Sequence, residues 1–342
     1  MDGATQTLDI AIYDMALEGQ AAEVLRQAFL ASAARGVRAR IAYNQEAANH
    51  RRPLPPPGFV DHRFLETLPV EHRHIPGVPD LMHHKYVVRD TAIPAAAVWT
   101  GSTNWTRDSW TREENVIVRV ADPAVASVYA ADFEELWTSR SVRRSGHEMP
   151  AWSEGSGVRV RPYFTPGRAE KLVHEIAQRI ASARRRVRVC SPVITSGPIL
   201  GTLAETAGRP GLDIAGCFDA TQMAEVEWQW GHSPTSSWKL AAWRTVHAAL
   251  PWGEKRSTPY APGSVHDFMH AKCTVADDTV FVGSYNLSHS GEQNAENVLE
   301  IEDPGVADRF AEYIDRVAAR YRPPARPSPA AVPGADPDPG GN

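Results

Sequence analysis

Two short stretches of the chain, LMHHKYVVRD at residues 81–90 and FMHAKCTVAD at residues 268–277, align with each other without gaps. Both contain the pattern H-x-K-x4-D, which places six residues in equivalent positions: His83, Lys85, Asp90, His270, Lys272 and Asp277. Self-similarity between distant parts of one chain indicates a duplicated structural unit. The sequence therefore predicts two similar halves, each with its own copy of the pattern.

The alignment continues beyond each copy. GSTNWTRDSWTREENV at 101–116 aligns without gaps to GSYNLSHSGEQNAENV at 283–298. Both segments contain G-S-x-N, with the polar residues Ser102, Asn104, Ser284 and Asn286. Thirteen residues after each motif glycine stands a glutamate, Glu114 or Glu296. Each copy then reaches an Asp-Pro pair, which typically starts a helix.

The periodicity of apolar residues predicts an α/β fold. Residues 8–14 and 186–194 have the composition of buried strands, and in each half a helical stretch and a second strand follow. This strand–helix–strand order is typical of mixed or parallel sheets flanked by helices. The second half has an additional strand and helix at 158–186, so we expect the given N-terminus to lack one such unit, and the alternative of an export signal within that unit stays open.

Composition gives the expected domain limits. The polar, Gly- and Ser-containing segment 139–157 has the character of a linker. We predict an N-terminal repeat at 1–145, a C-terminal repeat at 146–321 and a disordered Pro/Gly-rich tail at 322–342.

The paired motifs contain the groups that phosphodiester chemistry requires. A histidine and a lysine two residues apart on a strand have their side chains on the same face. Lysine and asparagine donors can hold the nonbridging oxygens of a phosphodiester. One neutral imidazole can attack phosphorus and a protonated one can donate to the leaving oxygen. We expect no metal or other cofactor, since the lysines supply the countercharge, and the cluster at 71–85 that contains His72, His74 and His83 lacks a carboxylate at metal-ligand spacing.

These motifs resemble the phospholipase D superfamily, the two-repeat HKD phosphodiesterases, over residues 8–321. The resemblance implies two similar α/β sandwich domains related by a pseudo-twofold axis, with both motifs meeting at one active site. It implies His83 as the nucleophile and His270 as the general acid. It also implies that Glu114 and Glu296 hold the far nitrogens of these imidazoles. Asp90 and Asp277 are interpreted as residues that hold the local backbone.

The overall composition favours a cytoplasmic globular enzyme. The chain has 342 residues, 42% of them hydrophobic, a net charge of −5 and three cysteines, an odd number that disfavours a disulfide framework. It contains no apolar run near the roughly 20 residues that span a bilayer. We expect a monomer with possible peripheral contact to membranes.

Three functions remain open at this stage. The first is hydrolysis or transfer of a phospholipid headgroup through a phosphohistidine, and the second is a metal-independent endonuclease acting on DNA or RNA. The third is a catalytically silent phosphate-binding scaffold, which the two intact histidines disfavour. The segment 225–252 holds five of the ten tryptophans and is interpreted either as a helical subdomain with its own core or as a wall of the substrate cleft.

Overall fold

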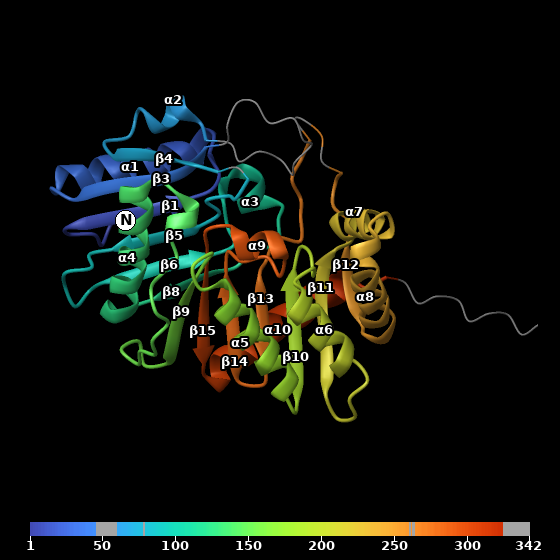
Figure 1. Cartoon of the computed structure of the whole chain (residues 1–342). Helices are drawn as coiled ribbons and strands as arrows, with labels where there is room; N and C mark the ends of the chain where they lie inside the picture. Colours follow the sequence, from blue (N-terminus) through green and yellow to red (C-terminus); the bar gives the residue numbers. More distant parts are fainter. Residues whose placement is uncertain (46–59, 78, 260, 262–263, 324–342) are drawn as a thin grey trace, which may run out of the picture.

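The two halves of the chain form two mixed β-sheets with equivalent strand orders (Figure 1). A computed structural model describes residues 1–45, 60–77, 79–259, 261 and 264–323. The first sheet has the order β4 (Glu71–Pro76), β3 (Arg38–Gln45), β1 (Thr7–Ile12), β5 (Lys85–Arg89), β6 (Ala97–Gly101) and β8 (Ile117–Val120). The second has the order β12 (Trp252–Lys255), β11 (Asp213–Asp219), β10 (Arg186–Ser191), β13 (Cys273–Ala276), β14 (Thr279–Gly283), β15 (Glu296–Glu302) and β9 (Arg159–Thr165).

The pairing directions repeat as well. In each sheet the first three strands are parallel and the following strands are antiparallel. Strand β9 and the helix after it, α5 (Ala169–Ser182), have no counterpart among the described residues of the first half. The asymmetry expected from the sequence is therefore present. A separate two-stranded sheet pairs β2 (Met15–Ala16) with β7 (Trp105–Thr106).

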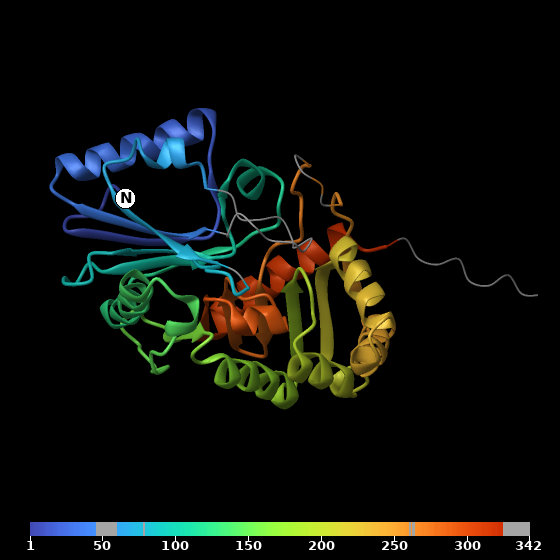
Figure 2. The same ribbon diagram turned by 45° about the horizontal axis from the view of Figure 1, so that its top comes forward.

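The helices lie in layers on both sides of the sheets. The first half contains α1 (Gly19–Ala34), α2 (His62–Leu65), α3 (Arg107–Thr111) and α4 (Pro123–Ser139). After α5, the second half contains α6 (Gly197–Thr206), α7 (Ala220–Gly231), α8 (Ser237–Ala249), α9 (His289–Gln293) and α10 (Pro304–Arg320). Figure 2 shows α4 and α10 between the two sheets, with α1 outside the first sheet and α5 and α6 outside the second.

The two expected Asp-Pro helix starts are confirmed. The carboxylates of Asp122 and Asp303 accept hydrogen bonds from the first-turn amides of α4 and α10, and a proline occupies the first helical position in both. Proline costs nothing there, because that N–H has no partner within the helix. The helix starts thus fix where the chain leaves β8 and β15 to cover the inner faces of the sheets.

One apolar core joins the halves. It contains residues of both sheets and of both inner helices, among them Tyr86, Val98 and Phe133 from the first half and Val275, Leu299 and Ile314 from the second. Two further cores lie on the outer faces, one under α1 and one under α5 to α8. The expectation of two α/β units with mixed sheets flanked by helices is confirmed.

The tryptophan-rich segment forms the α7–α8 hairpin and strand β12. Trp230, Trp243 and Trp252 belong to the outer core of the second half, whereas Trp228 and Trp238 are 64% and 49% exposed. Three of the five tryptophans are thus packed in the core of the second half and do not form a separate core of the hairpin. Among the described helices, none is long and apolar enough to cross a membrane. Most of the tail expected to be disordered, from residue 324 on, lies outside the described residues.

Candidate active site

The two H-x-K segments lie where the halves meet, and each is bonded to the opposite half. The backbone N–H of His83 donates to the carbonyl of Ala295 at 2.9 Å, and that of His270 donates to the carbonyl of Glu114 at 3.0 Å. Each histidine lies just ahead of a central strand rather than within it, since β5 begins at Lys85 and β13 begins after Lys272. The backbone thus carries both imidazoles into the same interface.

A polar side chain at the end of the strand two places away in the sheet, β3 or β11, holds the residue before each histidine. Asn44 Oδ1 accepts from the amide of Met82 at 3.0 Å. Asp219 Oδ2 accepts from the amide of Met269 at 3.0 Å. Sequence analysis missed both residues, although each is the seventh position of its strand counted from Arg38 or Asp213, so aligning those strands would have revealed them.

His83 is paired with a carboxylate of the second half. Its Nδ1 lies 2.8 Å from Glu296 Oε2, and the glutamate side chain is fully buried. The ring of Tyr13 packs edge-on against the imidazole at 4.7 Å between centroids. This pair matches the partner expected from the sequence.

His270 is paired with two residues of the first half. Its Nδ1 lies 3.0 Å from Asn115 Oδ1 and 3.2 Å from Glu113 Oε2. Among the described residues, the carboxylate of Glu114 is not bonded to His83 or to His270. Its carboxylate instead accepts from the hydroxyl of Tyr321 and lies 3.8 Å from the ammonium of Lys255. The expectation that Glu114 holds one of the two imidazoles is therefore corrected, since Asn115 and Glu113 lie at His270 Nδ1.

A one-residue difference in the local register explains this correction. Gly101 is the strand partner of Ile117, sixteen residues on, whereas Gly283 is the partner of Val298, fifteen residues on. The extra residue moves Asn115 into the position that Glu296 has in the other half. The similar letters EENV and AENV concealed this shift.

The two motif serines lie behind the histidines. Ser102 Oγ donates to Asn115 Oδ1 and Ser284 Oγ donates to Glu296 Oε2, both at 2.6 Å, and both serines are fully buried. The expectation that these hydroxyls bind the substrate phosphate is thus not met. The motif glycines permit this packing, because a Cβ on Gly101 or Gly283 would lie 2.0 Å from a carbonyl oxygen of the neighbouring strand.

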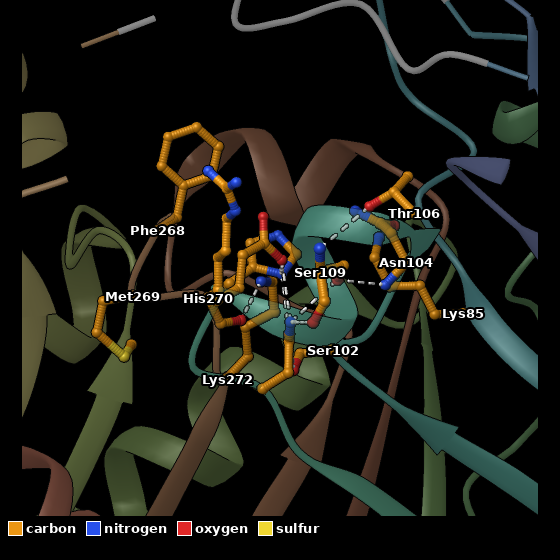
Figure 3. Close-up of polar contacts among 12 residues, drawn as sticks. Lys85, Ser102, Asn104, Thr106, Ser109, Phe268, Met269, His270 and Lys272 are labelled. Atoms are coloured by element: carbon orange, nitrogen blue, oxygen red, sulfur yellow. Dashed lines mark hydrogen bonds and ion pairs between the residues drawn. The ribbon is translucent and has the colours of Figure 1, made fainter. Parts of the chain in front are cut away.

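Figure 3 shows side chains of the second motif, His270 and Lys272, beside Ser102 and Ser109 of the first half. Each lysine ammonium donates to the carbonyl of the histidine of its own motif, Lys85 to His83 at 2.7 Å and Lys272 to His270 at 2.5 Å. Both lysines are buried. They therefore bring positive charge to the floor of the site, next to both imidazoles.

Burial and this positive charge shift the titration of the site. Burial lowers the pKa of both imidazoles well below 6.5, and the charges of Lys85 and Lys272 lower it further. Burial also lowers the pKa of Lys85 to about 7 and raises that of Glu296 to about 7. Burial likewise raises the pKa of the Glu113 carboxyl. The site thus disfavours charge of either sign as long as it holds no anion.

The remaining motif residues divide between the site and the far ends of the strands. The amide oxygens of Asn104 and Asn286 are buried and have no hydrogen-bond partner among the described residues, so these amides can still reorient toward a ligand. Asp90 and Asp277 have left-handed backbone conformations, with φ of 54° and 51°. Their carboxylates accept from three successive amides each, at 5–7 and at 184–186. They hold the starts of β1 and β10.

The comparisons with known proteins identify the family and agree with the two-repeat fold. The family profile described as "Cardiolipin synthase, PLD-like domain" matches residues 1–137 and 176–318. Phosphatidylserine synthase from Haemophilus influenzae Rd KW20 is similar in structure, with a TM-score of 0.63 at 12% identity over 92% of this chain and 82% of that one. No curated protein sequence matches the chain.

Two further solved structures each cover about half of this chain. Nuc from Salmonella typhimurium, a phospholipase D family member, has 20% identity over 51% of this chain and 97% of that one, with a TM-score of 0.35. NucT from Helicobacter pylori has 19% identity over 48% of this chain and 96% of that one, with a TM-score of 0.36.

Proposed function

The chain belongs to the family of cardiolipin synthase, PLD-like domains, and from that premise we propose that it cleaves a phosphodiester through a covalent phosphohistidine on His83. The proposal adds to family membership the identity of the nucleophile, the general acid and the class of substrate. The observation that carries it is the exchange of partners across the halves, in which each imidazole is held at Nδ1 by a side chain of the opposite half.

This exchange supports a single site with two different histidine roles. An imidazole whose Nδ1 is held by an acceptor has its Nε2 directed away from that acceptor. The pKa of each histidine is well below 6.5, which favours the neutral ring of a nucleophile in the free protein. Glu296, the better-aligned carboxylate, stabilises positive charge on His83 as its Nε2 bonds to phosphorus.

In the first step the Nε2 lone pair of His83 forms a bond to phosphorus while the bond from phosphorus to the leaving oxygen breaks. His270 gives the leaving oxygen its proton. The ammoniums of Lys85 and Lys272 and the amides of Asn104 and Asn286 supply donors for the nonbridging oxygens. In the second step His270 takes a proton from water or an alcohol, whose oxygen attacks phosphorus and releases His83.

The substrate itself prepares the general acid. Positive charge from two lysines lowers the pKa of His270 in the free site. A bound phosphodiester adds a negative charge next to these lysines and so raises the pKa of His270 toward neutrality. Glu113, 3.2 Å from Nδ1, stabilises the protonated ring further. His270 therefore gains its catalytic proton when the substrate binds.

A phospholipid is the substrate class that we favour. The net charge of −5 gives no general attraction to nucleic acid. Trp228 and Trp238 expose large indole surfaces on the α7–α8 hairpin, as proteins do that rest on a lipid–water interface. Hydrolysis and transfer to an alcohol share the same first step, so the acceptor decides between them.

The test incubates the protein, with a chelator present, with phosphatidylcholine vesicles and with single-stranded DNA in parallel. We expect release of the headgroup without cleavage of the DNA, and loss of more than about 1,000-fold of this activity in His83→Ala and His270→Ala. Cleavage of DNA alone would identify a nuclease. A His83→Ala protein with full turnover would refute the assigned roles.

A further inference from the structure

A second histidine, His84, lies next to the nucleophile and takes no part in the steps above. It is completely buried, and its Nδ1 lies 3.2 Å from Asn297 Nδ2. Its Nε2 lies 3.2 Å from Asp132 Oδ2 on α4, without the alignment of a hydrogen bond. Burial of a polar imidazole costs free energy unless its nitrogens are hydrogen-bonded. The neighbours of His84 therefore determine which of its nitrogens carries the proton.

The other half has no equivalent of this arrangement. Ala271 follows His270 where His84 follows His83, and Val116 follows Asn115 where Asn297 follows Glu296. The helix α10 carries Tyr313 at the position that Asp132 has in α4, counted from the Asp-Pro start of each helix. The additional polar groups therefore belong to one of the two histidines alone.

The orientation of the Asn297 amide is determined by its neighbours. Its Oδ1 accepts hydrogen bonds from the hydroxyls of Thr100 and Tyr129. Its Nδ2 must therefore face His84 Nδ1 and Ser284 Oγ, which lies 3.4 Å away. Since an NH2 group only donates, His84 Nδ1 must accept, and the proton of a neutral His84 is on Nε2, facing Asp132.

The chain of bonds continues to the nucleophile. Ser284 Oγ accepts from the backbone and side-chain N–H groups of Asn297, so its own hydrogen is directed to Glu296 Oε2. Glu296 Oε2 is also the acceptor nearest to His83 Nδ1. When Glu296 is ionised, its Oε2 can only accept, so His83 holds its proton on Nδ1 and its Nε2 lone pair is available.

We propose that His84 is a positioning residue which, through Asn297, Ser284 and Glu296, fixes the Nδ1-protonated tautomer of His83. His84, Asn297, Ser284 and Glu296 form one hydrogen-bonded series, and all four residues are buried in the interface between the halves. His84 and His83 come from the first half, whereas the three residues that connect them come from the second. The tautomer of the nucleophile thus depends on correct docking of the two halves.

The expected effect on the reaction rate rests on the proposed function. The tautomer of His83 can be measured whether or not the protein cleaves a phosphodiester. We would label the histidines with ¹⁵N and record long-range ¹H–¹⁵N correlations of the free protein, which distinguish the two tautomers of each ring. In the wild type we expect one set of signals for His83, with the proton on Nδ1. In His84→Leu, which keeps volume but removes the acceptor, we expect His83 to populate both tautomers while the signals of His270 stay unchanged.

Two further variants control for folding. His84→Gln retains an acceptor for Asn297 and should restore the wild-type pattern of His83. Tyr129→Phe removes a single hydroxyl that orients Asn297, and should loosen the His83 tautomer even if His84→Leu does not fold. An unchanged His83 tautomer in both His84→Leu and Tyr129→Phe would overturn the proposal.

The kinetic arm follows formation of the phosphoryl-enzyme in a single turnover. We expect its rate to fall roughly 10- to 100-fold in His84→Leu, the range seen when a partner behind a ligating histidine is lost. A tautomer change in a protein that cleaves no phosphodiester would support the positioning role and reject the proposed function. If a variant in which His83 populates both tautomers formed the phosphoryl-enzyme at the normal rate, the tautomer would not control the rate.

Discussion

Among single residues, Glu113 and Glu114 are neighbours in sequence with separate surroundings. The carboxylate of Glu113 lies 3.2 Å from His270 Nδ1, and that of Glu114 contacts Tyr321 of the second half. Glu113→Gln removes the charge that stabilises a protonated His270, so we expect kcat to fall about 100-fold on substrates with an alkoxide leaving group. Glu114→Gln should change kcat less than about twofold and lower stability instead.

A substrate with a good leaving group separates these effects. Bis(p-nitrophenyl) phosphate releases nitrophenolate, which needs little help from a general acid, so Glu113→Gln should retain most of its activity on it. An equal loss on both substrates would show that Glu113 does not support the general acid.

Glu296 makes stability depend on pH. Burial raises the pKa of its carboxyl from 4.5 to about 7. At this carboxyl the folded state therefore binds more protons than the unfolded state between these values, and the stability that Glu296 contributes is lost as pH rises from 4.5 through about 7. In Glu296→Gln this contribution should be absent, so the difference in unfolding free energy between the variant and the wild type should change by roughly 3 kcal/mol across the window.

Urea unfolding at pH 5, 6 and 7 measures this slope. The exposed Glu170→Gln provides a control of the same chemistry and should follow the wild type. Lys85, whose pKa burial lowers to about 7, acts in the opposite direction and only above that pH. A Glu296→Gln protein that loses stability in parallel with the wild type would contradict the burial argument.

At the scale of elements, the sequence predicts the strands and helices that carry the site but not their register. The G-S-x-N segments and the Asp-Pro helix starts repeat clearly enough to align the two halves. Between α3 and β8, however, one extra residue shifts Asn115 into the position of Glu296, and the repeated letters ENV favour the wrong alignment. The hydrogen bonds between β6 and β8 and between β14 and β15 determine this register, and the repeated letters do not reveal which residues pair.

The same limit applies to the polar network behind His83. His84 and Asn297 are 213 residues apart, and the other half has Ala271 and Val116 at the equivalent positions. Asn44 and Asp219, by contrast, occupy equal positions in strands that align, so comparison of the halves predicts them. Duplication reveals the shared features of the site, whereas its asymmetric features need the packed structure.

The α7–α8 hairpin offers an element-scale prediction. Trp243 is fully buried, packs against Phe218 and donates from its indole N–H to Glu227. Trp243→Ala should therefore lower the free energy of unfolding by about 3–5 kcal/mol. Trp228 in the same hairpin is 64% exposed, so Trp228→Ala should lower the free energy of unfolding by less than about 0.5 kcal/mol.

Denaturant unfolding followed by far-UV circular dichroism compares the two variants. Their activities on vesicles add a second measurement, because Trp228→Ala should weaken lipid binding without loss of stability. A stable Trp243→Ala protein would mean that the hairpin does not depend on the core of the second half.

For the whole molecule, the exchange of partners makes the halves interdependent. His83 takes its carboxylate from the second half, and His270 takes Asn115 and Glu113 from the first. The inner core likewise contains side chains of both sheets and of both α4 and α10. Either half alone would expose this apolar surface to water, at about 25 cal/mol for each Å².

The interdependence of the halves can be tested by expressing them as two separate polypeptides. Residues 1–145 and 146–342, expressed alone, should be aggregation-prone and inactive, because each lacks the partners of its histidine and half of its core. Co-expressed, they should form a one-to-one complex that recovers activity, since the contacts of the inner core and the site need no covalent link. Gel filtration and turnover measure both results. Activity of 146–342 by itself would show that a second copy can replace the first half at His270, and would refute the interdependence argued from Asn115 and Glu113.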